Sequence, residues 1–132
     1  NEKNKQRLTP LHLAAKEGHK DIVSILVNNR AIVDPENKYG DTPLHFASAN
    51  GHISVVEILI SWGAEINEEN VLGNTPLHRA VNSGHKSLVE MLIKEGANIN
   101  AKTEFTDSPL TVAIRTGNKE VIQLLKSKGA LE

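Results

Sequence analysis

The stretch Thr42-Pro43-Leu44-His45 decides the fold of this chain, because it recurs at a constant step. The other copies are Thr9-Pro10-Leu11-His12, Thr75-Pro76-Leu77-His78 and the altered Ser108-Pro109-Leu110-Thr111. They begin at positions 9, 42, 75 and 108, each 33 residues after the one before. A fixed internal period of this length indicates a repeat protein.

Each period encodes a short helix whose start and end are both marked. Thr9 is a good N-cap, because its hydroxyl accepts hydrogen bonds from the unpaired N–H groups of the first turn. Pro10 suits the first helical position, where its missing donor would be unpaired in any case. Leu11 and Ala14 lie one turn apart and form a narrow apolar stripe. Gly18 ends the helix, since glycine adopts left-handed geometry at little cost.

A second, more apolar helix follows in each period. In the first two periods its apolar positions are Ile22, Val23, Ile25, Leu26 and Val27, and then Val55, Val56, Ile58, Leu59 and Ile60. The linkers at 38–41 and 71–74 carry turn residues, so we predict that they form projecting, hairpin-like loops. Helices this short are marginal alone in water, so each pair must cover its neighbour, which predicts a linear stack.

Composition excludes several classes of function. The 132 residues carry a formal net charge of -1, which gives no long-range attraction to nucleic acid. The absence of cysteine excludes disulfides and thiolate metal sites. No apolar run approaches the roughly 20 residues that span a bilayer, so we expect no membrane insertion. We therefore expect a cytoplasmic or otherwise intracellular protein.

The period and its Thr-Pro-Leu-His motif resemble the ankyrin-repeat family over essentially the whole chain. The resemblance implies an all-α fold, an α-solenoid of helix–loop–helix units joined by β-hairpin-like loops. We expect one domain over residues 1–132, with repeats at approximately 4–36, 37–69, 70–102 and 103–132. It also implies that the loop tips and the inner helices line a concave surface that binds other proteins.

Several positions depart from the repeat. Arg30 stands where the other periods have glycine, and a left-handed arginine costs about 1 kcal/mol, so we expect that turn to be reshaped. Arg7 and Thr106 replace the loop glycines at 40 and 73, which calls the hairpin geometry of the first and last loops into question. Thr111 replaces the histidine of the motif.

The two ends of the array also differ in sequence. Lys126 occupies a position that is valine or isoleucine in the other periods, as expected of a capping repeat on which nothing apolar stacks. Leu13, Ile22 and Ile25 of the first period instead have the character of interior residues. Because the chain also begins at Asn1, we expect further repeats or another domain before it.

The histidines are candidates for metal binding or acid–base chemistry, and we weigh this against a structural role. They are His12, His19, His45, His52, His78 and His85. Both sets advance one period at a time, and packed units lie roughly 10 Å apart, too far for shared coordination. The resemblance implies hydrogen bonds within and between repeats instead. We therefore expect no metal, no cofactor, no small-molecule substrate and no catalytic residue.

The loop tips are the favoured partner-binding site. Tyr39, Leu72 and Phe105 share one repeat position, so they should project in a row, with Val71 beside Leu72. Exposed apolar rows mark interaction sites, and aromatic anchors are frequent hot spots. The alternative is that these side chains pack on adjacent loops and stiffen the row. The polar residues expected to flank them are Lys38, Asp41, Asn74, Glu104 and Asp107.

The C-terminal ends of the first helices provide the expected polar rim of the concave surface. The resemblance places there residues that precede each repeat glycine, for which the alternative is a solvated helix end. Those predicted to contact a partner are Ala49, Asn50, Asn82, Ser83, Arg115 and Thr116.

Four further residues stand out from the repeat. Trp62 aligns with polar residues, so it either covers a neighbouring loop or forms a second contact on the outer face. Arg79 replaces an apolar residue and should extend its charge into water, where it could reach a partner. In the ankyrin family, asparagines placed like Asn67 and Asn100 can be hydroxylated, although their ordinary role is to form turns.

These observations favour a protein–protein interaction module, expected to be a monomer, whose partner is another protein. Two alternatives belong to other classes. One is a structural or mechanical repeat segment of a larger linker, channel or toxin. The other is a regulatory module fused to an enzyme, with catalysis outside these residues.

Overall fold

The computed structural model describes residues 5–28 and 32–131, and within these ranges it consists of eight α-helices and connecting loops, with no strand. The helices are α1 (Pro10–Glu17), α2 (Lys20–Asn28), α3 (Pro43–Ala49), α4 (Ile53–Ser61), α5 (Pro76–Asn82), α6 (Lys86–Lys94), α7 (Pro109–Thr116) and α8 (Lys119–Ser127). The predicted all-α fold is confirmed.

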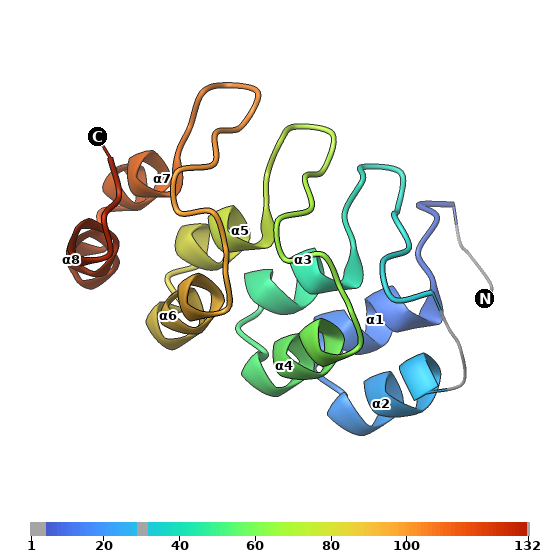
Figure 1. Cartoon of the computed structure of the whole chain (residues 1–132). Coiled ribbons are helices and arrows are strands. Elements are labelled where there is room, and N and C mark those ends of the chain that lie inside the picture. The colour runs from blue at the N-terminus through green and yellow to red at the C-terminus, as the bar shows by residue number, and fades with distance from the viewer. Residues whose placement is uncertain (1–4, 29–31, 132) are drawn as a thin grey trace.

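The helices form four antiparallel pairs stacked in chain order, with α1, α3, α5 and α7 in one layer and α2, α4, α6 and α8 in the other (Figure 1). The loop before each odd-numbered helix projects from the same edge of the stack (Figure 1). We call these loops fingers 1 to 4, at residues 5–8, 37–41, 70–74 and 103–107. A finger and the helix pair after it form one unit, numbered 1 to 4.

The odd-numbered helices begin as the sequence predicts. Thr42 has extended backbone geometry, and its hydroxyl accepts a hydrogen bond from the backbone N–H of His45. The His45 ring returns the interaction by accepting from the Thr42 N–H, which completes a capping box. Units 1 and 3 repeat this arrangement, whereas Ser108 caps α7 without a histidine.

The core lies between successive helix pairs. Each odd-numbered helix packs on the next odd-numbered helix, while in the other layer α2 packs on α4 and α6 packs on α8. Leu44, Leu77 and Leu110 are buried at this junction in units 2 to 4. Burying one leucine side chain contributes about 1.5–3 kcal/mol, so most of the stability lies at contacts between units.

The face of unit 1 that has no preceding unit keeps its interior character but is open to solvent. Ile22 is 48% exposed, while its counterparts Val55, Leu88 and Val121 are at most 1% exposed. Leu13 and Ile25 on the same face are also exposed.

The opposite face, on unit 4, is mixed rather than fully polar. Lys126 is exposed there, as the capping pattern predicts. Ile114, however, is 54% exposed, although its counterparts Ala15, Ser48 and Val81 are fully buried. An apolar side chain therefore remains on this face, which the sequence analysis did not anticipate.

The first and last fingers keep the turn geometry that their sequences called into question. Arg7 and Thr106 both have φ of 64°, close to the 76° and 81° of Gly40 and Gly73. A side chain in this region costs about 1 kcal/mol. In finger 4 the Thr106 N–H donates to the Thr103 carbonyl, and in finger 1 the Gln6 carbonyl accepts from the Lys38 N–H of finger 2. Arg30 lies outside the described residues.

Candidate functional site

Fingers 2, 3 and 4 are each closed by one polar side chain at the base. The Asn37 carboxamide oxygen accepts hydrogen bonds from the backbone N–H groups of Tyr39 and Asp41, both at 2.9 Å. Asn70 binds finger 3 in the same way, and the Thr103 hydroxyl does so at 3.2 Å in finger 4. Backbone bonds from Asn37 to Asp41 and from Gly40 to Asn37 complete the hairpin-like loop. This side-chain position could have been found in the sequence, because residues 37, 70 and 103 all carry a short acceptor one period apart.

Backbone hydrogen bonds also join neighbouring fingers. The Lys38 N–H donates to the Gln6 carbonyl, Val71 to Tyr39, and Glu104 to Leu72, at 2.8–2.9 Å. The fingers therefore form a bonded row rather than four separate loops. A partner would meet tips whose backbone positions are already fixed.

The tip side chains lie largely in solvent. Tyr39 is 48% exposed, Leu72 42%, Val71 63% and Phe105 67%. The Lys38 ammonium lies 5.0 Å from the centre of the Tyr39 ring, a cation–π contact within one tip. Because Tyr39 and Leu72 are each covered over more than half of their surface, partner binding and packing on adjacent fingers both stay predictions for this row.

Asp41 is not a surface residue, contrary to the prediction that it flanks the tips. It is 5% exposed, and its carboxylate receives the Arg79 guanidinium at 3.0 and 3.1 Å and the Asn70 amide at 2.9 Å. Arg79 reaches Asp41 because this helix position faces the preceding unit, as the equivalent Phe46 does where its ring packs against His12. Arg79 therefore ties unit 3 to finger 2, and the prediction that its charge extends freely into water is wrong.

Unit 4 has an arginine–aspartate pair of its own, in which the arginine comes from a different repeat position. The Arg115 guanidinium donates to Asp107 at 2.8 Å, with 62% of the arginine side chain and 19% of the aspartate side chain exposed. Beside this pair, a groove of about 320 Å³ lies between fingers 3 and 4 and helices α5 and α7. Leu72 and Phe105 line it from the fingers, and Asn82 lines it from α5.

The predicted polar rim is exposed at most of its positions. Asn50, Asn82, Ser83, Arg115 and Thr116 are exposed at the C-terminal ends of the odd-numbered helices. Ala49 is half-buried, and so is Asn74 at the base of finger 3. Asn50 is also partly engaged, because its amide donates to the Lys16 carbonyl at 3.2 Å.

The histidines of the motif hold successive units together. In His45, Nδ1 accepts from the Thr42 N–H, so the proton lies on Nε2, which donates to the Asn74 carbonyl at 2.8 Å. His12 and His78 do the same toward Asp41 and Asp107. Burial lowers the pKa of His45, and that of His78, below the ordinary value of 6.5. Their neutral form is therefore the one that links the units.

Two histidines of the second set, His52 and His85, also bridge neighbouring units. His52 Nε2 lies 2.9 Å from the Lys16 carbonyl, and His85 Nε2 lies 3.1 Å from that of Ala49. A β-carbon on Gly18 would lie 2.7 Å from the His52 ring, so this turn needs glycine for close approach as well as for its φ of 77°. Across residues 5–28 and 32–131, no group of three or more histidines, aspartates or glutamates is arranged to hold a metal ion.

Asn67 and Asn100 form hydrogen bonds that link neighbouring linkers. Asn67 accepts from the Asn98 N–H at 2.7 Å and donates to the Gly96 carbonyl at 3.3 Å, while Asn100 accepts from the Leu131 N–H at 2.9 Å. These bonds fit the turn-forming role, and hydroxylation stays a prediction.

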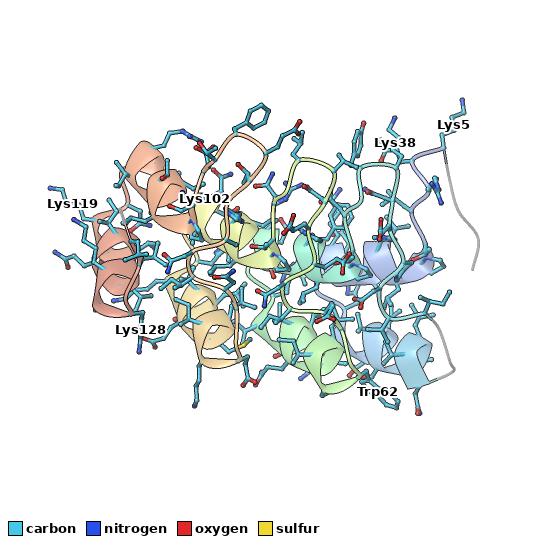
Figure 2. All side chains as sticks on the ribbon, turned by 45° about the horizontal axis from the view of Figure 1, so that its top comes forward. Lys5, Lys38, Trp62, Lys102, Lys119 and Lys128 are labelled. Atoms are coloured by element: carbon cyan, nitrogen blue, oxygen red, sulfur yellow. The ribbon has the colours of Figure 1, made fainter. Side chains whose placement is uncertain are left out.

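Trp62 directly follows α4 and is 49% exposed. It corresponds to Glu95 of the next unit, which with Met91 lines an open groove of about 350 Å³ between α4 and α6. Trp62 lies away from the fingers (Figure 2).

In the part of the chain that the structure describes, no helix is both long and apolar enough to cross a lipid bilayer. Comparison with curated proteins finds no match. A protein-family model described as "Ankyrin repeats (3 copies)" matches residues 1–70 and, a second time, residues 64–131. The chain belongs to the ankyrin-repeat family. Ankyrin repeats generally serve as protein–protein interaction modules, and the eight helices are consistent with four such repeats.

Proposed function

We propose that this ankyrin-repeat chain binds another protein through the tips of its fingers and the adjoining ends of α3, α5 and α7. The observation that carries the proposal is the row of exposed apolar side chains, Tyr39, Leu72 and Phe105, on fingers whose backbones are hydrogen-bonded to one another. Exposed apolar patches on a soluble surface mark interaction sites.

The rigidity of the row supports the same proposal. Each tip is held by its base side chain and by its neighbour, so docking orders little additional backbone and loses little conformational entropy. In this proposal the surface binds a partner and catalyses no reaction. The tip side chains act as apolar anchors, and Asn82, Ser83 and Thr116 form a polar rim around them. Asp41 is omitted from this surface because its carboxylate is occupied inside the stack.

The test replaces Tyr39, Leu72 and Phe105 together with alanine. We expect the immobilised variant to lose the proteins that the unaltered chain retains from a cell extract, identified by mass spectrometry. Thermal stability should change little, because these side chains are largely exposed.

A matched control removes three apolar side chains of comparable exposure away from the tips. Ile25, Ile32 and Leu131 are 58%, 66% and 69% exposed. The control triple-alanine variant should retain the same proteins as the unaltered chain. Equal loss in both variants, or unfolding of the tip variant, would contradict the proposal.

A further inference from the structure

The stack ends in two open faces, and both carry exposed apolar side chains. We call the outer face of unit 1 the leading face and the outer face of unit 4 the trailing face; they lie at opposite ends of the stack (Figure 1). Leu13 and Ile22 on the leading face are 45% and 48% exposed, and Ile114 on the trailing face is 54% exposed. The residues equivalent to Ile22 and Ile114 in the other units are buried, because a neighbouring unit covers them. Each end face would therefore bury apolar surface by stacking on another unit.

The internal junctions show which charged groups meet when one unit stacks on the next. The Lys86 ammonium of unit 3 lies 3.7 Å from the Glu120 carboxylate of unit 4. One repeat after Lys86 comes Lys119 on the trailing face, and three repeats before Glu120 comes Asp21 on the leading face. Both are exposed, and Lys119 lies at the end of the stack (Figure 2). Stacking a leading face on a trailing face would therefore repeat the lysine–acid pair of the junction between units 3 and 4.

The acidic position is selective for these two junctions. Units 2 and 3 have Ser54 and Ser87 where unit 1 has Asp21 and unit 4 has Glu120. An acidic group therefore stands at this position only in unit 4, which meets Lys86, and in unit 1, which would meet Lys119. The charges of the two end faces are complementary in the register that the repeat itself dictates.

The second set of histidines gives the same register independently. His52 and His85 are half-buried, and each ring lies within 3.1 Å of a carbonyl on the preceding unit. Their equivalent on the leading face is His19, which is exposed. The carbonyl that corresponds to those of Lys16 and Ala49 on the trailing face is that of Arg115. A stacked leading face would place the His19 ring beside this carbonyl.

We propose that this chain associates head to tail with a second copy of itself, the leading face of one copy stacking on the trailing face of the other. Ile114 then packs against Leu13 and Ile22, and Lys119 pairs with Asp21. The interface continues the packing of the stack and leaves the finger tips free, so it goes beyond the proposed function and replaces the monomer expected from the sequence. Because the two faces differ, a dimer still has one of each open and longer arrays form.

Two substitutions make this junction weaker than the internal ones. Thr111 stands where units 1 to 3 have the histidine that bonds to the next unit. Lys126 would lie over Ile25, because the equivalent Ile60 and Met91 line one groove between units 2 and 3. The aliphatic stem of a lysine can cover an apolar side chain while its ammonium stays in water. We therefore expect assembly at micromolar concentrations and above.

The first test is the weight-average mass of the unaltered chain, measured by sedimentation from low micromolar to millimolar concentration. We expect a monomer at the lowest concentration and a mass that rises past that of a dimer at the highest. A mass that stays that of a monomer throughout would overturn the proposal, and would leave a further repeat of a longer chain as the occupant of the leading face.

The second test blocks one face at a time. Ile22→Lys closes the leading face and Ile114→Lys closes the trailing face, and both side chains are about half exposed, so both variants should keep the thermal unfolding of the unaltered chain. Each variant alone should be monomeric. Their equimolar mixture should form a one-to-one complex that grows no further, because only one leading and one trailing face remain. Continued dimerisation of Ile114→Lys alone would show that two leading faces meet each other, which overturns the head-to-tail arrangement.

The third test exchanges the charges. Lys119→Glu and Asp21→Lys should each weaken association about fivefold, and the double variant should restore most of it. Lys94→Glu, a change of the same kind at an exposed position within the stack, serves as the control and should leave association unaltered. Equal weakening by the control, or no restoration in the double variant, would show that the register is wrong.

A last comparison separates this inference from the proposed function. The variant with Tyr39, Leu72 and Phe105 replaced by alanine should assemble like the unaltered chain, since the tips lie outside the junction. Loss of assembly in that variant would show that the tips themselves bind the second copy, and would overturn the stacking of the end faces. Its loss of captured proteins, by contrast, tests only the proposed function.

Discussion

The same helix face is exposed to solvent in unit 1 and buried in unit 3. Ile22 of unit 1 is 48% exposed, while Leu88, its counterpart in unit 3, is 1% exposed beneath unit 2. The two side chains occupy the same position on similar helices. The difference shows that burial here is supplied by the neighbouring unit and not by the unit itself, which is how a stack of helix pairs gains stability.

The largest expected effect comes from truncating the buried side chain of this pair, with truncation of the exposed one as the comparison. Leu88→Ala should lower the free energy of unfolding by about 2–5 kcal/mol, because it leaves a cavity between units 2 and 3. Ile22→Ala should cost less than about 1 kcal/mol, since about half of that residue is already exposed. Urea unfolding of the two variants measures both. Similar losses would show that the face of unit 1 is also covered in solution.

A second pair of variants compares the motif histidine of unit 2 with the residue that replaces it in unit 4. His45→Ala removes the ring that accepts from the Thr42 N–H and leaves the Asn74 carbonyl without its donor, so we expect a loss of about 2 kcal/mol. Thr111→Ala changes the same position in unit 4, where the side chain is exposed, and should cost under about 0.5 kcal/mol. Chemical unfolding again gives the comparison, and equal costs would refute the view that His45 acts between units.

A smaller change should stabilise the stack. The Ser48 hydroxyl is buried and has no hydrogen-bond partner among the described residues, whereas units 1 and 3 have Ala15 and Val81 at this position. Ser48→Ala should therefore raise the free energy of unfolding by about 1 kcal/mol. A lower midpoint in thermal unfolding would indicate that the hydroxyl is satisfied after all.

The smallest expected effect is a pH dependence from the motif histidines. Burial lowers the pKa of His45 and His78 below 6.5 in the folded chain, so the unfolded chain binds more protons below that pH. Stability should accordingly fall as the pH drops from about 6.5 toward the lowered pKa values. Burial raises the pKa of Asp34 and Glu68, whose contribution has the opposite sign at lower pH. Urea midpoints at about pH 7.5 and 5.5 test this, and a flat profile would contradict it.

The fold was predictable because its determinants repeat. The motif at Thr42, the helix-ending Gly18 and the apolar face around Leu59 recur at a fixed step, and four concordant copies outweigh a substitution in any one. The helix pairs and the projecting loops follow from this redundancy, and the linking role of the histidines was implied by the resemblance to the ankyrin repeat.

What the sequence did not predict depends on single residues that break the repeat. The bond between Arg79 and Asp41 crosses from one unit to the finger before it, and no periodic pattern indicates such a pair, because the other units have an apolar residue where unit 3 has Arg79. Arg7 and Thr106 keep a left-handed turn that their own propensities disfavour, because hydrogen bonds from neighbouring positions hold it. Exposure at the tips is likewise set by three-dimensional packing.

The hydrogen bonds that cross between units have a short and regular reach: those of the motif histidines span 29 residues, and that from Arg79 spans 38. A substitution at one finger is therefore felt by its immediate neighbours and no farther. The effects of exchanges at fingers 1 and 4 on binding should then simply add. Recognition could be retuned one finger at a time, with the fold left unaltered.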